Sequence, residues 1–397
     1  MYLLNFFNYL LSIAGLILMI PIAVFTVECL AAVLPLSEGT KTELKNRPQT
    51  AILIPAHNEA DQIELVVKTA KKQLQDSDRL IVIADHCQDN TAQIARNAGA
   101  TVIERIAEID RGKGYALDCG LRYLEQNEPP EIVVFLDADC IVEDRALAYI
   151  TCLASQTQRP VQAQYLMEQV DNPSLRDRVS TFALHVKNRV RFLGLNRLGG
   201  HCLLTGSGMA FPWSAIERVS LVGAVNADDM KLTVDLTLEN AVPTYCEEAL
   251  VVGRLMKDED AQSQRTRWEH GHLQMISVEV PRLMKAFLKN PRFSLLLLAL
   301  DISIPPLSLL VITWLGAIAM SFGATFFGVS FLPTIILSLG GLLLFTSVFA
   351  VWSKFGTQDL PLKDVIAVPF YIIGKIPIYL KFLVNPQTGW LSTERDL

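Results

Sequence analysis

Long apolar runs constrain the fold of this chain more than any other feature, because a lipid bilayer is the environment in which such runs are stable. From Tyr2 to Leu36 the only acidic or basic residue is Glu28. This run exceeds the roughly 20 residues that a membrane-spanning helix needs. Two further runs, at about 294–322 and 325–353, are separated by an uncharged segment. The sequence therefore predicts a multi-pass integral membrane protein.

Basic residues beside these runs predict the topology. Lys41, Lys45 and Arg47 follow the first run and no basic residue precedes it, so the positive-inside rule places the next domain in the cytoplasm and the N-terminus outside. Lys354 and Lys363 follow the third run, which fits a hairpin that crosses outward and returns. The first run is too long for a cleaved signal peptide and lacks its basic start. We expect a location in the plasma (inner) membrane.

Two apolar segments carry charges that are costly in hydrocarbon. Residues 271–293 mix apolar side chains with Arg and Lys, as an amphipathic helix in a headgroup layer does. Residues 364–384 contain Lys375 and Lys381 besides two prolines, which favours an interfacial or bundle-buried helix over a fourth span. Asp301, within the second run, either faces a polar conduit or lies at the interface.

These observations divide the chain into five expected parts. The chain contains seven scattered cysteines without a CxxC pair, and six of them lie in the polar part, which indicates a reducing compartment without disulfides or zinc. A formal charge of −6 excludes an electrostatic nucleic-acid binder. The parts are 1–36, an N-terminal transmembrane helix; 37–270, a cytoplasmic domain; 271–293, an interfacial helix; 294–353, a transmembrane hairpin; and 354–397, an interfacial or third C-terminal membrane segment with a tail.

Strand-loop-helix units recur in the polar domain. Residues 50–74, 79–100 and 131–150 each begin with a short apolar run and continue at helical spacing. Fully apolar strands that alternate with helices predict an α/β fold with a mostly parallel sheet covered on both faces. Ligands of such sheets bind at the carboxyl ends of the strands.

Acid-bearing loops follow each of these strands: PAHNE at 55–59, ADHCQD at 84–89 and DAD at 137–139. Side chains alternate along a strand, so Asp137 and Asp139 are expected to point the same way. Their hard oxygen atoms suit Mg²⁺ or Mn²⁺ on a diphosphate. An acidic turn or helix cap after a strand would give the same sequence pattern. Asp85 is either a nucleotide contact or a cap for the helix at Asn90. Lys113, between two glycines, is either a ligand contact or a solvated turn lysine.

Seven motifs in order carry a resemblance to a known family: IPAHNE, ADHCQDNT, RGKGYAL, FLDAD, LTGSGMAF, ADDMKL and QRTRW. Over about residues 50–270 the chain resembles the nucleotide-sugar-dependent glycosyltransferases of family 2, in particular the membrane-embedded branch with cellulose, chitin and hyaluronan synthases. The resemblance implies a GT-A type, Rossmann-like sheet domain.

The resemblance also implies roles for particular residues. Asp229 would be the general base. Asp228 stands where the family has Glu, so its role stays open. Alternatively, Asp229 is only an acid at a helix N-terminus, where the helix macrodipole favours negative charge. Arg267 would bind the diphosphate, and the indole of Trp268 would stack on the acceptor sugar. Alternatively, both residues anchor an interfacial helix at the headgroup level. The other implied positions are Pro55, Ala56, Glu59 and Asp85 for the uridine, Lys113 beside the nucleotide, Asp137 and Asp139 for Mg²⁺ or Mn²⁺ on the diphosphate of the donor, and Gly206, Ser207, Gly208 and Gln264 for the acceptor and diphosphate site.

Three functions follow for comparison. The first is a processive synthase, and the second is a transferase that adds one sugar to a membrane lipid. Both would use a nucleotide sugar, with UDP-sugars favoured, and both would invert the anomeric centre. The acceptor would be a glycan or a lipid-linked molecule. Export or assembly partners are candidates. The third, a non-catalytic scaffold or transporter, has no need of the acidic motifs. His270 and His272 diverge on a helix and are not expected to bind metal.

Overall fold

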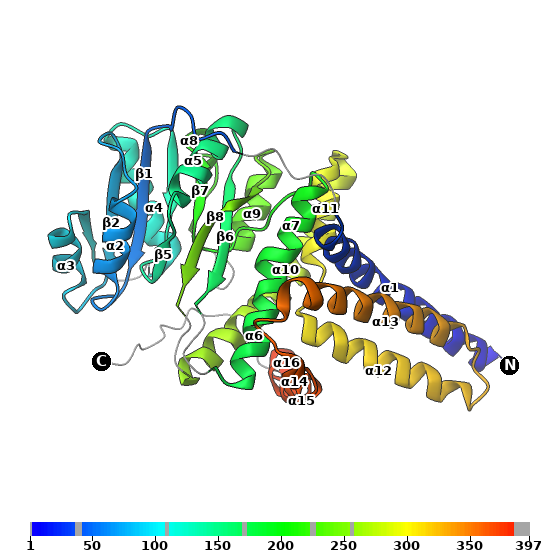
Figure 1. The fold of residues 1–397 in the computed structure, drawn as a ribbon. Coiled ribbons are helices and arrows are strands. Elements are labelled where there is room, and N and C mark those ends of the chain that lie inside the picture. Colours follow the sequence, from blue (N-terminus) through cyan, green and yellow to red (C-terminus); the bar gives the residue numbers. More distant parts are fainter. Residues whose placement is uncertain are drawn as a thin grey trace. The chain divides into compact units, whose positions relative to one another are not determined.

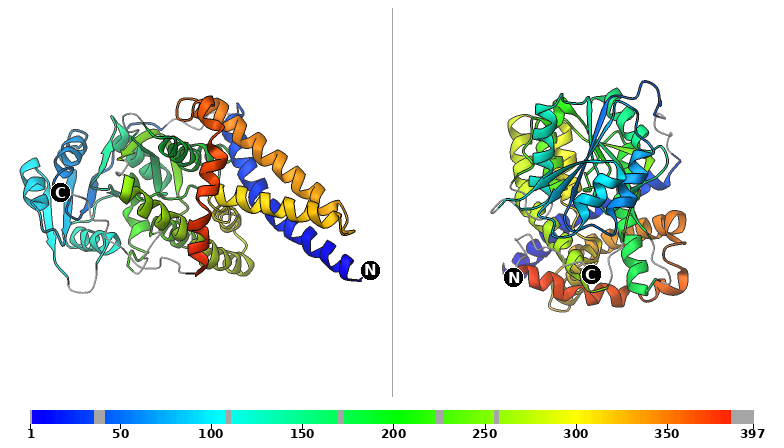
Figure 2. Two further views of the ribbon diagram at one scale, coloured as in Figure 1. Left: turned by 90° about the horizontal axis from the view of Figure 1, so that it is seen from below. Right: turned by 90° about the vertical axis from the view of Figure 1, so that its left-hand side faces the viewer.

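The computed structural model describes residues 2–35, 42–107, 111–168, 173–222, 228–254 and 258–384. Within this part of the chain two compact units are distinguished. The helical unit contains the described residues of 1–37, 172–198 and 265–387, and the sheet unit contains those of 38–171 and 199–264. Figures 1 and 2 show the ribbon of both units.

The sheet unit is built on one eight-stranded sheet with the order β3-β2-β1-β4-β7-β6-β8-β5 (Figure 1). Neighbours from β3 to β4 are parallel, as are β6 and β8, whereas β7 is antiparallel to β4 and β6, and β5 is antiparallel to β8. The strands are β1 Thr50–Ala56, β2 Arg79–Asp85, β3 Thr101–Arg105, β4 Ile132–Phe135, β5 Cys140–Val142, β6 Val161–Met167, β7 Met209–Pro212 and β8 Thr244–Gly253.

Both faces of this sheet are buried, which explains the continuous apolar runs of its strands. Along β1, Ile52 and Ile54 belong to the core under α2, α3 and α5, whereas Ala51 and Leu53 belong to the core under α4, α8 and α9. The expected α/β fold is thus confirmed, with a sheet that is mixed beyond β4. The helices are α2 Ile63–Lys71, α3 Thr91–Ala98, α4 Lys113–Gln126, α5 Ala146–Thr157, α8 Trp213–Ile216 and α9 Asp228–Leu238.

The helical unit contains three helices that are long and apolar enough to cross a membrane, at 4–33, 307–325 and 332–356. The run expected at 294–322 is divided at Pro305 and Pro306, because proline lacks an N–H donor and restricts the residue before it. The helices are α1 Tyr2–Val33, α6 Leu175–His185, η1 Val186–Val190, α7 Arg191–Arg197, α10 Asp258–Lys289, α11 Phe293–Ile302, α12 Leu307–Thr325, α13 Leu332–Val351, η2 Trp352–Gly356, α14 Leu362–Val365, α15 Val368–Gly374 and α16 Ile376–Val384.

Residues 172–198, which lie inside the expected cytoplasmic domain, belong to the helical unit. Their helix α7 packs closely on α1: a Cβ atom at Gly194 would lie 1.9 Å from the carbonyl oxygen of Glu28. The Nε of Arg191 donates to Oε2 of Glu28 at 2.6 Å, and its Nη2 donates to Oδ1 of Asp301. All three side chains are buried. Asp301 is therefore buried, and it bonds to a guanidinium that links α1, α7 and α11.

Removal of this guanidinium should destabilise the helical unit strongly. Arg191→Met leaves two buried carboxylates without their cation, and breaking a buried pair costs about 3–5 kcal/mol. We expect a lower midpoint of thermal unfolding for the purified protein in detergent, measured by loss of the monodisperse peak in size-exclusion chromatography. Arg122→Met is the matched control, since the Arg122 side chain is 70% exposed and pairs with Asp118 one turn away. Equal midpoints for the two variants would contradict the structural role of Arg191.

Candidate active site

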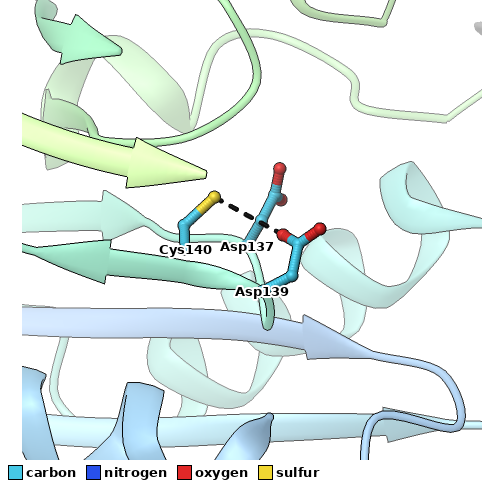
Figure 3. A group of neighbouring side chains, drawn as sticks. All are labelled: Asp137, Asp139 and Cys140. Carbon is cyan, nitrogen blue, oxygen red and sulfur yellow. Dashed lines mark hydrogen bonds between the residues drawn. The ribbon is translucent and has the colours of Figure 1, made fainter. Parts of the chain in front are cut away.

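The loop between β4 and β5 carries the DAD motif. Figure 3 shows the carboxylates of Asp137 and Asp139 side by side, with Cys140 at the start of β5. One oxygen of each carboxylate and the sulfur of Cys140 all lie within 4.8 Å of one another. A turn, in which the N–H of Cys140 donates to the carbonyl of Asp137 at 3.1 Å, brings the acids together. The two side chains lie together as expected, although a turn and not strand alternation is the cause.

Lys113 lies against this pair. It is the first residue of α4, and its Nζ donates to Oδ1 of Asp137 and, at 2.7 Å, to the carbonyl oxygen of Gly206. Burial alone would lower the pKa of Lys113, but the carboxylates of Asp137 and Asp229 outweigh it and raise the pKa above its usual value. The lysine is therefore a charged member of the cluster and not a solvated turn residue.

Gly206 lies at the centre of these groups. A Cβ atom built there would lie 3.5 Å from Nζ of Lys113, 3.7 Å from Oδ2 of Asp229 and 3.9 Å from Oδ2 of Asp137. The φ angle of Gly206 is +93°, a conformation that side chains of L-residues disfavour. Two charged acids and one ammonium thus surround a backbone position that has no side chain of its own.

Hydrogen bonds fix the segment around Gly206. The N–H of Asp137 donates to Oγ of Ser207 at 3.0 Å. The N–H of Leu204 donates to Oγ1 of Thr233, whose hydroxyl donates to the carbonyl of Asp229, which anchors the start of α9. Gly208 has no room for a side chain, because a Cβ atom would lie 2.7 Å from Val251. The side chain of Asp228 lies outside the described residues.

The charge of this cluster favours a cation. Burial raises the pKa of Asp137, and the nearby carboxylates of Asp139 and Asp229 raise it further, while Lys113 opposes them. Three carboxylates share one ammonium in this part of the described chain. A divalent ion beside Asp137 and Asp139 would relieve that repulsion, and hard oxygen donors are the ligands that Mg²⁺ and Mn²⁺ prefer. The residues present therefore fit the expected metal.

Asp85 ends β2 at the neighbouring loop. Its Oδ1 accepts from Nη1 of Arg105 at 2.6 Å and lies 2.9 Å from Nδ1 of His86. The helix-capping role belongs instead to Asp89, which accepts from the N–H of Thr91 at 3.0 Å. Asp85 is therefore not the cap. The contact with Arg105 could not be foreseen from the sequence, because a lone arginine 20 positions from Asp85 gives no local signal.

The loop after β1 is joined to the loop after β2. Pro55 and Ala56 close β1, and the thiol of Cys87 donates to the carbonyl of Ala56 at 3.4 Å. The N–H of Glu59 donates to Oγ1 of Thr91 at 2.8 Å, and the Glu59 side chain is buried. The first two acidic loops are thus adjacent, as parallel strands require.

The QRTRW motif lies on α10. Arg267 and Trp268 belong to the helical unit, where Trp268 is 38% exposed, and the side chain of Gln264 lies outside the described residues. His270 and His272 of the same helix contact backbone carbonyls of different segments, through Nε2 to Ile378 at 2.9 Å and to Ile302 at 3.2 Å. Burial lowers the pKa of His272 to about 3.

Comparison with known proteins gives a family match for part of the chain. Residues 51–208 match the family described as glycosyl transferase family 2. A 4,4'-diaponeurosporenoate glycosyltransferase of Staphylococcus aureus is 34% identical over 103 residues, which are 25% of this chain and 26% of the relative. The chain thus matches about a quarter of that relative's length. The resemblance to family 2 glycosyltransferases is confirmed for this segment.

One solved structure is similar over almost the whole chain. A mannosyltransferase of Pyrobaculum calidifontis, in complex with GDP-Man and Mn²⁺, superposes with a TM-score of 0.57 at 18% identity and covers 96% of this chain and 99% of its own. This similarity confirms the GT-A type fold with its N-terminal and C-terminal apolar helices.

Substitution of Gly206 tests whether the space among these groups must stay open. Gly206→Ala should lower the activity proposed below about tenfold or more, because the added methyl group would occupy the space between Lys113, Asp137 and Asp229, and small changes of geometry among reacting groups have a large effect on rate. Gly199→Ala is the matched control: Gly199 also has a positive φ, of +69°, but a Cβ atom there meets nothing within 4 Å. Both should lose about 1–2 kcal/mol of stability through backbone strain. Equal transfer rates of the two variants would contradict the placement of Gly206.

Proposed function

We propose that this chain, with a family 2 glycosyltransferase domain over residues 51–208, transfers a sugar from a nucleotide sugar to a lipid acceptor at a membrane. The observation that carries the proposal is the cluster of Asp137, Asp139, Lys113 and Asp229 around Gly206. It combines two carboxylates that can bind a divalent cation with a third carboxylate that can act as the general base. A scaffold or transporter needs no such set.

The side chains of this cluster have different proposed roles. Asp137 and Asp139 would hold Mg²⁺ or Mn²⁺, which supplies positive charge to the departing diphosphate. Lys113 adds a fixed ammonium beside the same acids. Asp229 accepts the proton of the acceptor hydroxyl, and a single displacement of this kind inverts the anomeric centre.

The nucleotide would bind at the two loops that follow β1 and β2. Pro55, Ala56, Glu59 and Asp85 are the proposed uridine contacts. Arg105 and His86 hold the Asp85 carboxylate in place, so that its orientation is set before a donor binds. A UDP-sugar is the favoured donor, and the GDP-Man complex of the similar mannosyltransferase makes GDP-sugars the necessary comparison.

A lipid acceptor is supported by two observations. Among the described residues, three apolar helices are long enough to span a bilayer, and the Staphylococcus relative is named a 4,4'-diaponeurosporenoate glycosyltransferase. Arg267 and Trp268 are proposed to bind the diphosphate and the acceptor. The positive-inside pattern supports a cytoplasmic catalytic face on the plasma membrane.

A donor panel tests this function. Purified full-length protein in nanodiscs made with bacterial membrane lipids is incubated with UDP- and GDP-sugars and Mn²⁺ or Mg²⁺, and products are measured by mass spectrometry. We expect one lipid product that carries a single added sugar, absent with Asp139→Asn. A ladder of products would establish a processive synthase instead. Absence of both transfer and nucleotide release with every donor would contradict a glycosyltransferase function.

A further inference from the structure

The last described segment of the helical unit, residues 362–384, consists of the three short helices α14, α15 and α16. These helices contain 4, 7 and 9 residues. In Figure 1 they are seen end-on, and in the left view of Figure 2 they run lengthwise across the direction of α1, α12 and α13. A spanning helix needs roughly 20 continuous residues, so this segment is too interrupted for a fourth span of that kind.

The polarity of this segment is inverted relative to a helix on a water-soluble protein. Its outward side is apolar: Phe370 is 75% exposed, and Leu383 is 77% exposed. Lys363 and Lys381 are its exposed charged residues, and they lie near the two ends. The other large exposed apolar residues are Leu362, Ile366, Ile373, Ile376, Leu380 and Val384. Such a continuous stripe marks a surface that another phase or molecule covers.

The polar side chains of the segment point inward instead. Lys375 pairs with Glu269 of α10, and the hydroxyl of Tyr379 bonds to Ser308 at the start of α12. Nearer the beginning, the hydroxyl of Tyr371 lies 3.0 Å from Oγ of Ser180 on α6.

Further polar contacts hold both ends of the segment. Asp364 pairs with Arg178 at 3.3 Å, and the carbonyl of Ile378 contacts His270. These bonds fix the rotation of the segment, so that its apolar side cannot turn inward.

We propose that residues 362–384 lie flat in the headgroup and acyl boundary of one bilayer leaflet, with the apolar stripe in lipid. Continuity supports lipid as the occupant, because the segment contacts α12, whose Leu315 and Phe322 are themselves exposed. The direction of the segment, across the spanning helices, is that of an in-plane helix. The two outer lysines can extend their ammonium groups to the phosphates. This membrane contact is independent of the proposed sugar transfer.

Site-specific fluorescence tests the depth of the stripe. A nitrobenzoxadiazole label is attached at Phe370→Cys in the full chain, in a Cys87→Ser and Cys119→Ser background, because the other native cysteines are buried. Label at Phe345→Cys on α13 serves as the deep control, and label at Leu65→Cys on α2 as the aqueous control; both native side chains are exposed apolar residues. Proteoliposomes contain lipids with a spin label at carbon 5 or carbon 12 of the acyl chain.

We expect the label at 370 to be quenched more by the shallow spin label than by the deep one, and to be protected from aqueous iodide. The label at 345 should show the reverse depth preference. Iodide quenching at 370 equal to that at 65 would overturn the proposal, as would dominant quenching by the deep spin label, which indicates a span. Protection from all three quenchers would indicate a protein partner and also overturn it.

Discussion

We expect Asp137→Asn and Asp139→Asn each to abolish metal-dependent sugar transfer. Loss of one carboxylate removes a ligand from the pair whose donor atoms lie within 4.8 Å of each other and leaves the diphosphate charge uncompensated. The measurement is the initial rate of nucleotide release with the best donor of the panel, over a titration of Mn²⁺. A decrease of at least 10³-fold is expected, since several kcal/mol of charge stabilisation are lost.

Asp144→Asn is the matched control for both variants. It removes a carboxylate from the same stretch of chain, but the Asp144 side chain is 94% exposed, and we expect normal activity. Full activity of either DAD variant, or of the wild-type protein in excess EDTA, would disprove the metal assignment.

Asp229→Asn is expected to lower turnover by about 10²-fold or more, the range typical of a general base, with nearly unchanged donor binding. The amide retains the shape of the side chain beside Gly206 but cannot accept the proton. Turnover is measured with saturating donor and acceptor, and donor binding by calorimetry. A fall in donor affinity that accounts for the whole loss would contradict the role of Asp229.

Two further variants make that test specific. Asp235→Asn changes an acid on the same helix α9 that pairs with Lys231, and it should remain active. Asp228→Asn tests the register of the motif: if it is inactive while Asp229→Asn is active, the base is the preceding residue.

The parts of the fold that follow from local patterns could be predicted. Apolar runs such as 132–135 mark strands buried on both faces, and the acids after them necessarily meet at one edge of the sheet because neighbouring strands are parallel. Asp85 and Asp137 are placed at this edge in this way, whereas Lys113 and Asp229 reach Asp137 from the starts of α4 and α9. The antiparallel strand β5 was not foreseen, because its three residues carry too short a pattern.

Long-range partners could not be predicted from the sequence. Glu28, Arg191 and Asp301 are separated by more than 100 positions each, and no spacing rule links a glutamate in an apolar run to an arginine in a polar domain. The same holds for Arg105, which pairs with Asp85 only because β3 lies beside β2. The helices of residues 173–198 carry charged residues every few positions, as the sheet unit does, so composition alone does not separate them from it.

Binding of Mn²⁺ tests the central claim most directly, that Asp137 and Asp139 form a divalent-cation site beside Lys113 and Asp229. Free Mn²⁺ is measured by electron paramagnetic resonance during titration of the full-length protein in detergent, with and without UDP. We predict one Mn²⁺ site per chain that UDP strengthens, weakened at least tenfold in Asp139→Asn and unchanged in Asp144→Asn. Wild-type affinity for Mn²⁺ in Asp139→Asn, with the same response to UDP, would contradict the account.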